Sequence, residues 1–197
     1  LARNGFLVHH ENGTPCDVTI INTCGFINDA KQESIDTILE YTHIKEKGDT
    51  QKVYVMGCLS QRYREELGQE MPEVDGFFGV YEHIDILEEL KGRFIKEASH
   101  ERQLATPRHY AYLKVAEGCN RTCSFCSIPL IKGNYRSKPW EELEKEGRYL
   151  AGKGIKELNL IAQDLSYYGY DLKKKAMLPE LVARLEALRE IHEGDLA

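Results

Sequence analysis

The sequence predicts an α/β fold in which an open parallel sheet with flanking helices is followed by a second, unfinished α/β domain. Strand-like and helix-like segments alternate along the chain, which is typical of parallel sheets with helical connections. The alternation stops between Gly92 and Arg108 and then resumes, and this break divides the chain into two parts. The 197 residues are enough for one full domain and part of another.

Composition describes an ordinary globular protein, with 42% hydrophobic and 29% charged residues. A formal net charge of -6 argues against a protein that coats nucleic acid through general positive charge. No apolar run approaches the roughly 18 to 20 residues of a membrane helix, and the first residues do not resemble a signal peptide. We therefore expect a cytoplasmic protein with no membrane partner.

The first part of the chain holds three expected strands, each followed by a helix. The run 17–22 is continuously apolar and rich in β-branched residues, as in a buried parallel strand. After it, Ile35, Ile38, Leu39 and Thr42 recur at helical spacing, which predicts an amphipathic helix. The full expected set is strands at 17–22, 52–56 and 74–78, and helices at 28–47, 60–69 and 81–91.

The second part begins after a segment without periodicity. Its expected elements are strands at 110–116 and 157–162 and helices at 139–152 and 178–192, with a cysteine-rich loop after the first strand. A complete (β/α)₈ barrel takes about 250 residues, so these units are only enough for the start of one. The expected domains are therefore 1–91 and 109–197, joined by a linker at 92–108.

Three of the six cysteines lie within eight residues, Cys119, Cys123 and Cys126, with the spacing C-x₃-C-x₂-C. The chain is too long to need disulfide cross-links and has no secretory signal, which favours metal chemistry in a reducing compartment. Three thiolates can hold three corners of an iron–sulfur cube, whereas a closed cluster or a structural zinc takes four ligands. The pattern favours an iron–sulfur site with one open position. A structural zinc with His109 as fourth ligand, and three unrelated buried cysteines, are the alternatives.

The local charge around the triplet differs from that of the whole chain. Residues 108–139 carry six basic side chains and one acidic side chain, Glu117, which gives +5 within a protein of net charge -6. An anionic group is expected near this segment. For Lys132 and Lys138, a solvated basic face is the alternative.

With Phe125 before its last cysteine, the triplet resembles the signature of the radical S-adenosylmethionine (SAM) enzymes, C-x₃-C-x-aromatic-C. The resemblance implies that the three cysteines bind a [4Fe-4S] cluster at the end of the first strand of a (β/α) barrel, and that SAM chelates its open iron. It also implies that Phe125 lies near the adenine of SAM. Gln163, at the end of the second expected strand, is the candidate for contact with the SAM amino group. Asp164 is a further site candidate or a simple turn residue.

Two further cysteines each follow a strand of the first part. Cys24 comes after the strand 17–22, and Cys58 comes after the strand 52–56. If these strands are parallel neighbours, both thiols lie at the same carboxyl edge of the sheet. Cys16 precedes its strand and is expected at the opposite edge, roughly 20 Å away at about 3.3 Å per residue, as a buried structural cysteine.

The sequences Asn-Thr-Cys-Gly-Phe-Ile at 22–27 and Gly-Cys-Leu-Ser-Gln-Arg at 57–62 resemble the amino-terminal domain of the methylthiotransferases, a family of radical SAM enzymes. The resemblance covers nearly the whole chain. It implies an auxiliary [4Fe-4S] cluster held by Cys24, Cys58 and a third cysteine upstream of Leu1, and so two [4Fe-4S] clusters in the complete protein. It implies the methylthiotransferase fold, with the radical SAM barrel truncated.

Two branches of this family can be compared with the chain. The segments 126–133, 136–139 and 162–169 resemble the branch that modifies ribosomal protein S-twelve. The tRNA-modifying branch usually has Gly-Gln-Asn where this chain has Ala-Gln-Asp at 162–164. The protein-modifying branch is therefore favoured.

That resemblance implies a transferase that adds a methylthio group to the β-carbon of an aspartate of ribosomal protein S-twelve of the small subunit. The implied partners are this protein and an electron donor, with RNA contact through the ribosome or through a missing carboxyl-terminal domain. We expect the fragment to be inactive on its own. A tRNA methylthiotransferase that acts on a modified adenosine and a non-catalytic iron–sulfur protein are the alternatives.

Overall fold

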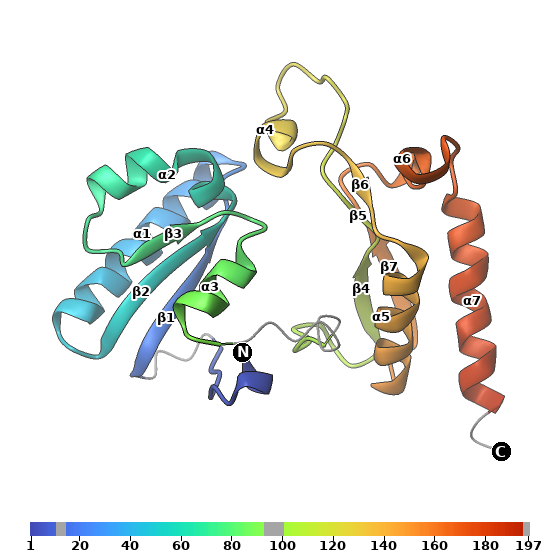
Figure 1. Cartoon of the computed structure of the whole chain (residues 1–197), viewed down its shortest axis with the longest axis horizontal. Helices are drawn as coiled ribbons and strands as arrows, with labels where there is room; N and C mark the ends of the chain where they lie inside the picture. The colour runs from blue at the N-terminus through green and yellow to red at the C-terminus, as the bar shows by residue number, and fades with distance from the viewer. Residues whose placement is uncertain (11–14, 93–100, 195–197) are drawn as a thin grey trace. The chain divides into compact units, whose positions relative to one another are not determined.

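The chain forms two compact units in a computed structural model, Leu1–Ile95 and Lys96–Ala197. The structure describes residues 1–10, 15–92 and 101–194, and of residues 189–194 only the backbone. Figure 1 traces both units. None of the helices in the described residues combines the length and the apolar character that a membrane crossing requires.

The first unit is a three-stranded parallel sheet in the order β1-β2-β3, and helices follow its strands (Figure 1). Ile38 of α1 and Leu59 of α2 pack with Val53 and Val55 of β2 in its apolar core. The unit comprises η1 (Ala2–Asn4), β1 (Cys16–Thr23), α1 (Asn28–Glu46), β2 (Thr50–Gly57), α2 (Cys58–Glu70), β3 (Gly76–Phe78) and α3 (His83–Glu89). The expected order of strands and helices is confirmed, and the central strand β2 contains the buried apolar run Val53, Tyr54 and Val55.

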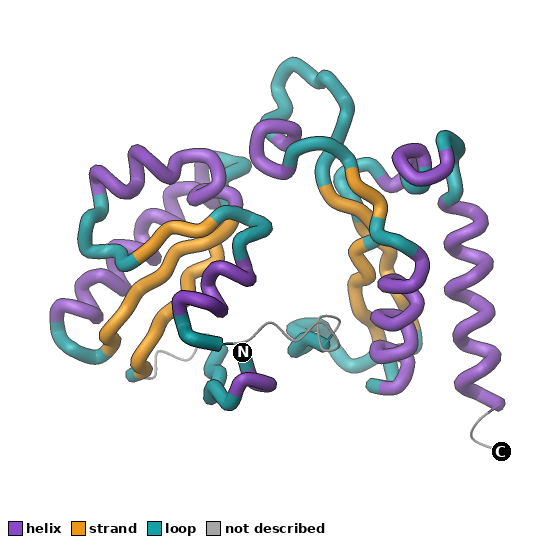
Figure 2. The backbone as a smooth tube through the Cα atoms, viewed as in Figure 1, coloured by secondary structure: helices purple, strands orange, loops and turns teal. Residues whose placement is uncertain are grey.

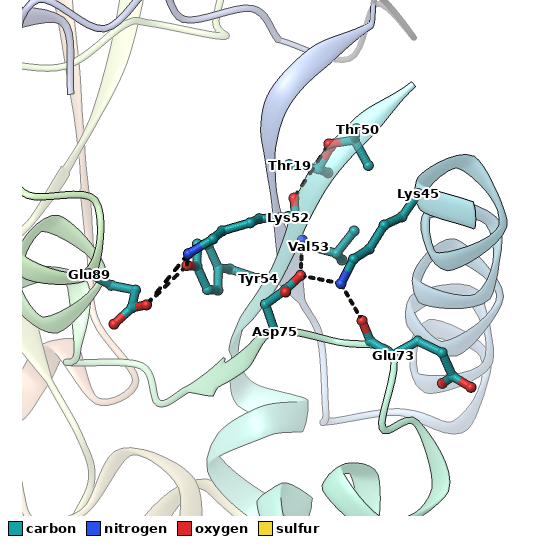
Figure 3. A network of polar contacts seen from close by, with 9 residues as sticks. All are labelled: Thr19, Lys45, Thr50, Lys52, Val53, Tyr54, Glu73, Asp75 and Glu89. Carbon is teal, nitrogen blue, oxygen red and sulfur yellow. Dashed lines mark hydrogen bonds and ion pairs between the residues drawn. The ribbon is translucent and has the colours of Figure 1, made fainter. Parts of the chain in front are cut away.

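A polar network fastens the strands of the first unit together (Figure 3). Asp75, just before β3, accepts hydrogen bonds from the Val53 N–H at 2.7 Å and from Lys45 Nζ at 2.6 Å. Although burial alone would raise the pKa of Asp75, these two bonds hold it below its usual value. At the start of β2, the hydroxyls of Thr19 and Thr50 lie 3.2 Å apart. The first network connects α1, β2 and the segment that precedes β3.

The second unit is built around the parallel pair β4 and β7. Leu113 of β4 is buried against Leu143 and Leu150 of α5 and Leu181 of α7. The unit comprises β4 (Tyr110–Lys114), β5 (Ala116–Glu117), α4 (Ile128–Lys132), β6 (Arg136–Ser137), α5 (Trp140–Gly152), β7 (Glu157–Ile161), η3 (Leu165–Tyr167), α6 (Tyr170–Lys173) and α7 (Leu178–Gly194). Strand and helix alternate as in the start of a (β/α) barrel, and no closed barrel forms within the described residues.

The expected strand 110–116 is two strands in the structure. The Val115 N–H still bonds to the Ile161 carbonyl of β7 at 3.0 Å, but the Val115 carbonyl accepts the Lys138 N–H at 2.8 Å. From there the chain pairs in antiparallel fashion with β6. The change of partner redirects the chain into a long loop, seen between β5 and α4 in Figure 2. Of the predicted linker at 92–108, residues 93–100 lie outside the described residues.

Candidate functional site

Cys24 and Cys58 stand at the carboxyl edge of the first unit's sheet. In the parallel register of β1 and β2, Thr23 is opposite Gly57, so that Cys24 and Cys58 each come directly after the last residue of a strand. Gly25 packs directly on the second cysteine: a Cβ added to it would lie 2.7 Å from the Cys58 carbonyl carbon and oxygen. The two cysteine segments therefore approach as closely as the backbone allows, and this approach requires glycine at position 25.

Ser34 of α1 fixes the backbone at Cys24. Its Oγ accepts the Cys24 N–H at 3.0 Å and donates to the Ala30 carbonyl at 2.8 Å, and the side chain is buried. The sequence did not predict this role of Ser34, because the bond joins two residues ten positions apart and leaves no hydrophobic signal. The expectation that Cys16 is buried is wrong: it is half-buried at the first position of β1, where its Sγ lies 3.4 Å from Thr19 Oγ1.

The cysteine triplet lies in a loop of the second unit, residues 118–127, which we call the cysteine loop. Its start is fastened to the segment after α4: the Cys119 N–H donates to the Gly133 carbonyl at 3.2 Å, and Asn120 Oδ1 accepts the Tyr135 N–H at 2.9 Å. Cys119 is buried, Cys123 is exposed and Cys126 is half-buried. All three carry free thiols.

The donor set of the cysteine loop fits an iron–sulfur cluster by its chemistry, since three thiols within eight residues are the ligands that such clusters take. The Cys126 N–H bonds to the Cys123 carbonyl at 3.1 Å, which closes a tight turn between these two ligands. Within the described residues, no three side chains of histidine, cysteine, aspartate or glutamate are gathered closely enough to hold a metal ion.

An ion pair joins the cysteine loop to the end of β7. Arg121 Nε donates to Asp164 Oδ2 at 2.7 Å, and the guanidinium lies 5.7 Å from the centre of the Tyr167 ring. The other oxygen of the carboxylate, Oδ1, accepts the Ser166 hydroxyl at 2.7 Å. The pKa of Asp164 is lowered by the bond from Ser166, against partial burial that acts in the opposite direction, and further by Arg121.

The other two residues that the radical SAM resemblance singled out face solvent. Phe125 is 92% exposed in the cysteine loop, and Gln163 is exposed in the segment that follows β7. Both residues lie in loops that follow strands, Phe125 after β5 and Gln163 after β7. Tyr135 was not predicted: its ring packs edge-on against Tyr167 at 5.1 Å, and its hydroxyl is buried. Burial raises the pKa of Tyr135 to about 12.

Much of the positive charge in segment 108–139 is neutralised by acidic side chains of the same unit. Glu117 lies between Lys114 and Lys132 and pairs with both. Two acids from outside the segment pair with two further cations of the segment: Asp164 with Arg121, and Glu146 with Lys138 at 3.0 Å. The sequence count of +5 thus overstates the net positive charge around the cysteine loop.

Two family models match the chain, one in each part. The uncharacterized protein family UPF0004 matches residues 1–79, and the radical SAM superfamily matches residues 113–195. The second match implies, in general terms, SAM and an iron–sulfur cluster as cofactors. The boundary between the two matches falls in the segment where the periodicity of the sequence is lost.

Similar proteins cover nearly the whole chain. It is 54% identical over 179 residues to the ribosomal protein uS12 methylthiotransferase RimO of Chlorobaculum tepidum. The matched residues make up 91% of this chain and 41% of that protein. The proteins of the same name from Cytophaga hutchinsonii and Bacteroides thetaiotaomicron are 51% and 50% identical over 97% and 95% of this chain, or 44% and 43% of their own lengths. The chain therefore spans less than half the length of these relatives.

Proposed function

We propose that this chain, which belongs to the same family as the ribosomal protein uS12 methylthiotransferases, forms the cluster-binding part of such an enzyme. The complete enzyme adds a methylthio group to the β-carbon of an aspartate of uS12. It uses a SAM-cleaving [4Fe-4S] cluster on the cysteine loop and an auxiliary [4Fe-4S] cluster at Cys24 and Cys58. An electron donor outside this chain completes the set of partners.

The observation that carries the proposal is the position of the two cysteine sets at the ends of parallel strands. Cys24 and Cys58 follow the paired parallel strands β1 and β2, and the cysteine loop follows the parallel strand β4 after the short antiparallel strand β5. Ligands of parallel α/β folds bind at the carboxyl ends of the strands. Two separate sulfur sites, one in each unit, match the need of this reaction for a radical source and a sulfur source.

The bound cluster with SAM would supply one electron that cleaves SAM and yields the radical that removes a hydrogen atom from the substrate carbon. The chain's own residues hold and orient these groups. Cys119, Cys123 and Cys126 would donate three thiolates and leave one iron open for SAM. Phe125, next to the last ligand, offers an exposed ring to the adenine, and Gln163 offers its amide to the SAM amino group.

The proposal is tested on the whole chain after anaerobic loading with iron and sulfide. We expect the electron paramagnetic resonance spectrum of the reduced protein to change when SAM is added, because the open iron accepts SAM. Cys123→Ala should abolish this change, and Cys16→Ala, which alters a cysteine at the far end of β1, should leave it intact. A spectrum that SAM does not alter would favour a non-catalytic iron–sulfur protein.

The substrate is tested in cells. Mass spectrometry of ribosomal protein uS12 from a strain that lacks the intact gene should show an aspartate without its methylthio group, and the complete gene should restore the modification. Loss of a methylthio group from tRNA, with uS12 unaffected, would contradict the assignment of the substrate. That result would assign the chain to a tRNA-modifying enzyme instead.

A further inference from the structure

We propose that Arg121 and Asp164 form a positioning pair that holds the cysteine loop against the carboxyl end of β7. The inference rests on the proposed function, in which this loop carries the cluster ligands. Neither side chain is a ligand in the proposal. Together they determine where the ligand-bearing backbone lies with respect to the strand end from which Gln163 projects.

The course of the loop explains why a single pair can have this effect. The loop is fastened at its start through Cys119 and Asn120, whose bonds reach the segment 133–135. Beyond them every residue from 121 to 125 is exposed. Arg121 is thus the point at which the loop is tied to β7 before the exposed stretch that contains Cys123.

The Asp164 side chain is held by a hydrogen bond that does not involve Arg121. Ser166 bonds to one carboxylate oxygen, so that the other oxygen is left for the arginine at 2.7 Å. The Asp164 side chain is only 14% exposed, whereas that of Arg121 is 59% exposed. Asp164 is therefore the more rigid partner and Arg121 the more mobile one, because a half-buried group with a second bond has less conformational freedom than a solvated side chain.

The aromatic neighbours of the pair add a second contact for the guanidinium. Arg121 lies over the Tyr167 ring at 5.7 Å, and Tyr167 in turn stacks on Tyr170 at 4.8 Å and meets Tyr135 edge-on. An arginine that contacts both a carboxylate and a ring face has its plane as well as its position defined. This restricts Arg121 more than the ion pair alone would.

The pair also acts on a ligand through the backbone. The Arg121 N–H points to Cys119 Sγ at 3.4 Å, a contact that a thiolate strengthens as an acceptor. Fixing the Arg121 side chain keeps this N–H directed at the sulfur atom. Loss of the pair should therefore loosen the exposed half of the loop and the N–H contact to its first cysteine.

The test uses hydrogen exchange of the whole chain without iron, followed in peptides that cover residues 118–127. We compare the parent protein with Asp164→Asn, Arg121→Gln and the double variant. Each single variant should speed exchange in this segment by up to about five-fold, the upper end of the range for one partly exposed ion pair. The double variant should exchange no faster than either single variant, because both remove the same contact. Arg121→Lys should recover part of the protection.

A matched control is Arg148→Gln, which breaks the Arg148–Glu144 pair on the surface of α5. It should leave exchange in the cysteine loop unchanged. Unaltered exchange in Asp164→Asn and Arg121→Gln, or effects of the two that add in the double variant, would overturn the proposal. Should Asp164→Asn fail to fold, Arg121→Gln alone decides, since that side chain is largely solvated.

A second measurement separates this inference from the proposed function. Iron retained after desalting is measured in a Cys24→Ala, Cys58→Ala background, so that only the cysteine loop binds iron. Asp164→Asn should retain several-fold less iron than this background alone. Altered exchange with a spectrum insensitive to SAM would support the pair and reject the function. A SAM-sensitive spectrum with exchange and iron retention unchanged by the substitutions would do the reverse.

Discussion

Replacement of Gly25 by alanine should separate the two cysteine segments of the first unit. The added Cβ would lie 2.7 Å from the carbonyl carbon and oxygen of Cys58 and 2.8 Å from the Leu59 nitrogen. All three are backbone atoms, so no side chain can rotate away to make room. The edge must open by about 0.7 Å, the difference between 2.7 Å and the 3.4 Å at which ordinary contacts begin.

The energetic effect follows from the rigidity of that edge. Overpacking of a well-packed interior costs about 1 to 3 kcal/mol. We expect Gly25→Ala to lower the free energy of unfolding of the first unit by that amount and to weaken iron retention at Cys24 and Cys58. Gly68→Ala is the control, because a Cβ there meets nothing within 4 Å. In the helix α2 it should stabilise the unit by about 0.5 to 1 kcal/mol.

The assay must distinguish the two units. Trp140 is the single tryptophan of the chain and belongs to the second unit, so its fluorescence during urea unfolding reports that unit alone. Hydrogen exchange of peptides from β1 and β2 reports the first unit. Gly25→Ala should accelerate exchange in β1 and β2 and leave the fluorescence transition in place. Exchange equal to that of the parent protein would show that the edge is soft and would refute the argument.

Two further predictions concern polar side chains of the same unit. Ser34→Ala leaves the Cys24 N–H without its bond and should lower the free energy of unfolding by about 1 to 2 kcal/mol. Thr37→Ala should have little effect in the same exchange assay, because the half-buried Thr37 hydroxyl bonds only to the Glu33 carbonyl of its own helix. For Asp75, burial opposes ionisation, but bonds such as that from Lys45 lower the folded-state pKa below the usual value of 3.8. Its stabilising contribution is therefore complete above about pH 5 and is lost as the pH falls through 3.8 towards the folded-state pKa. Asp75→Asn should reduce the slope of the free energy of unfolding against pH in this acid range. A slope equal to that of the parent protein would contradict the prediction.

The parallel sheet of the first unit could be predicted because its signal is local. A strand buried on both faces needs a continuous apolar run, and Val53, Tyr54 and Val55 of the central strand β2 provide it, whereas the edge strand β1 is mostly half-buried. The helix α1 was harder to orient. Its buried stripe is Ser34, Ile38 and Thr42, while the apolar Leu39 is 42% exposed. The serine turns inward because it bonds to the Cys24 backbone, and a hydrophobic pattern contains no information about such a bond.

The short elements of the second unit could not be predicted for a different reason. The helices α4 and α6 have five and four residues, too few for a hydrophobic period to appear. The division between β4 and β5 depends on the Lys138 N–H, which takes the Val115 carbonyl. Lys138 is distant from Val115 in the sequence, so no residue near Val115 indicates where the strand ends.

Asp164 shows how far the sequence could lead at the candidate site. A turn residue after a strand end was one interpretation, and the bond from Ser166, two positions along the chain, agrees with it. The second oxygen bonds to Arg121, which lies 43 positions away. The three cysteines indicate the chemistry through their spacing alone, since a thiolate set is recognised by which residues are close in sequence. In our proposal the position of these cysteines depends on the Asp164 carboxylate, which follows β7. The sequence alone does not show that β7 is the neighbour of β4, so it could not predict this contact.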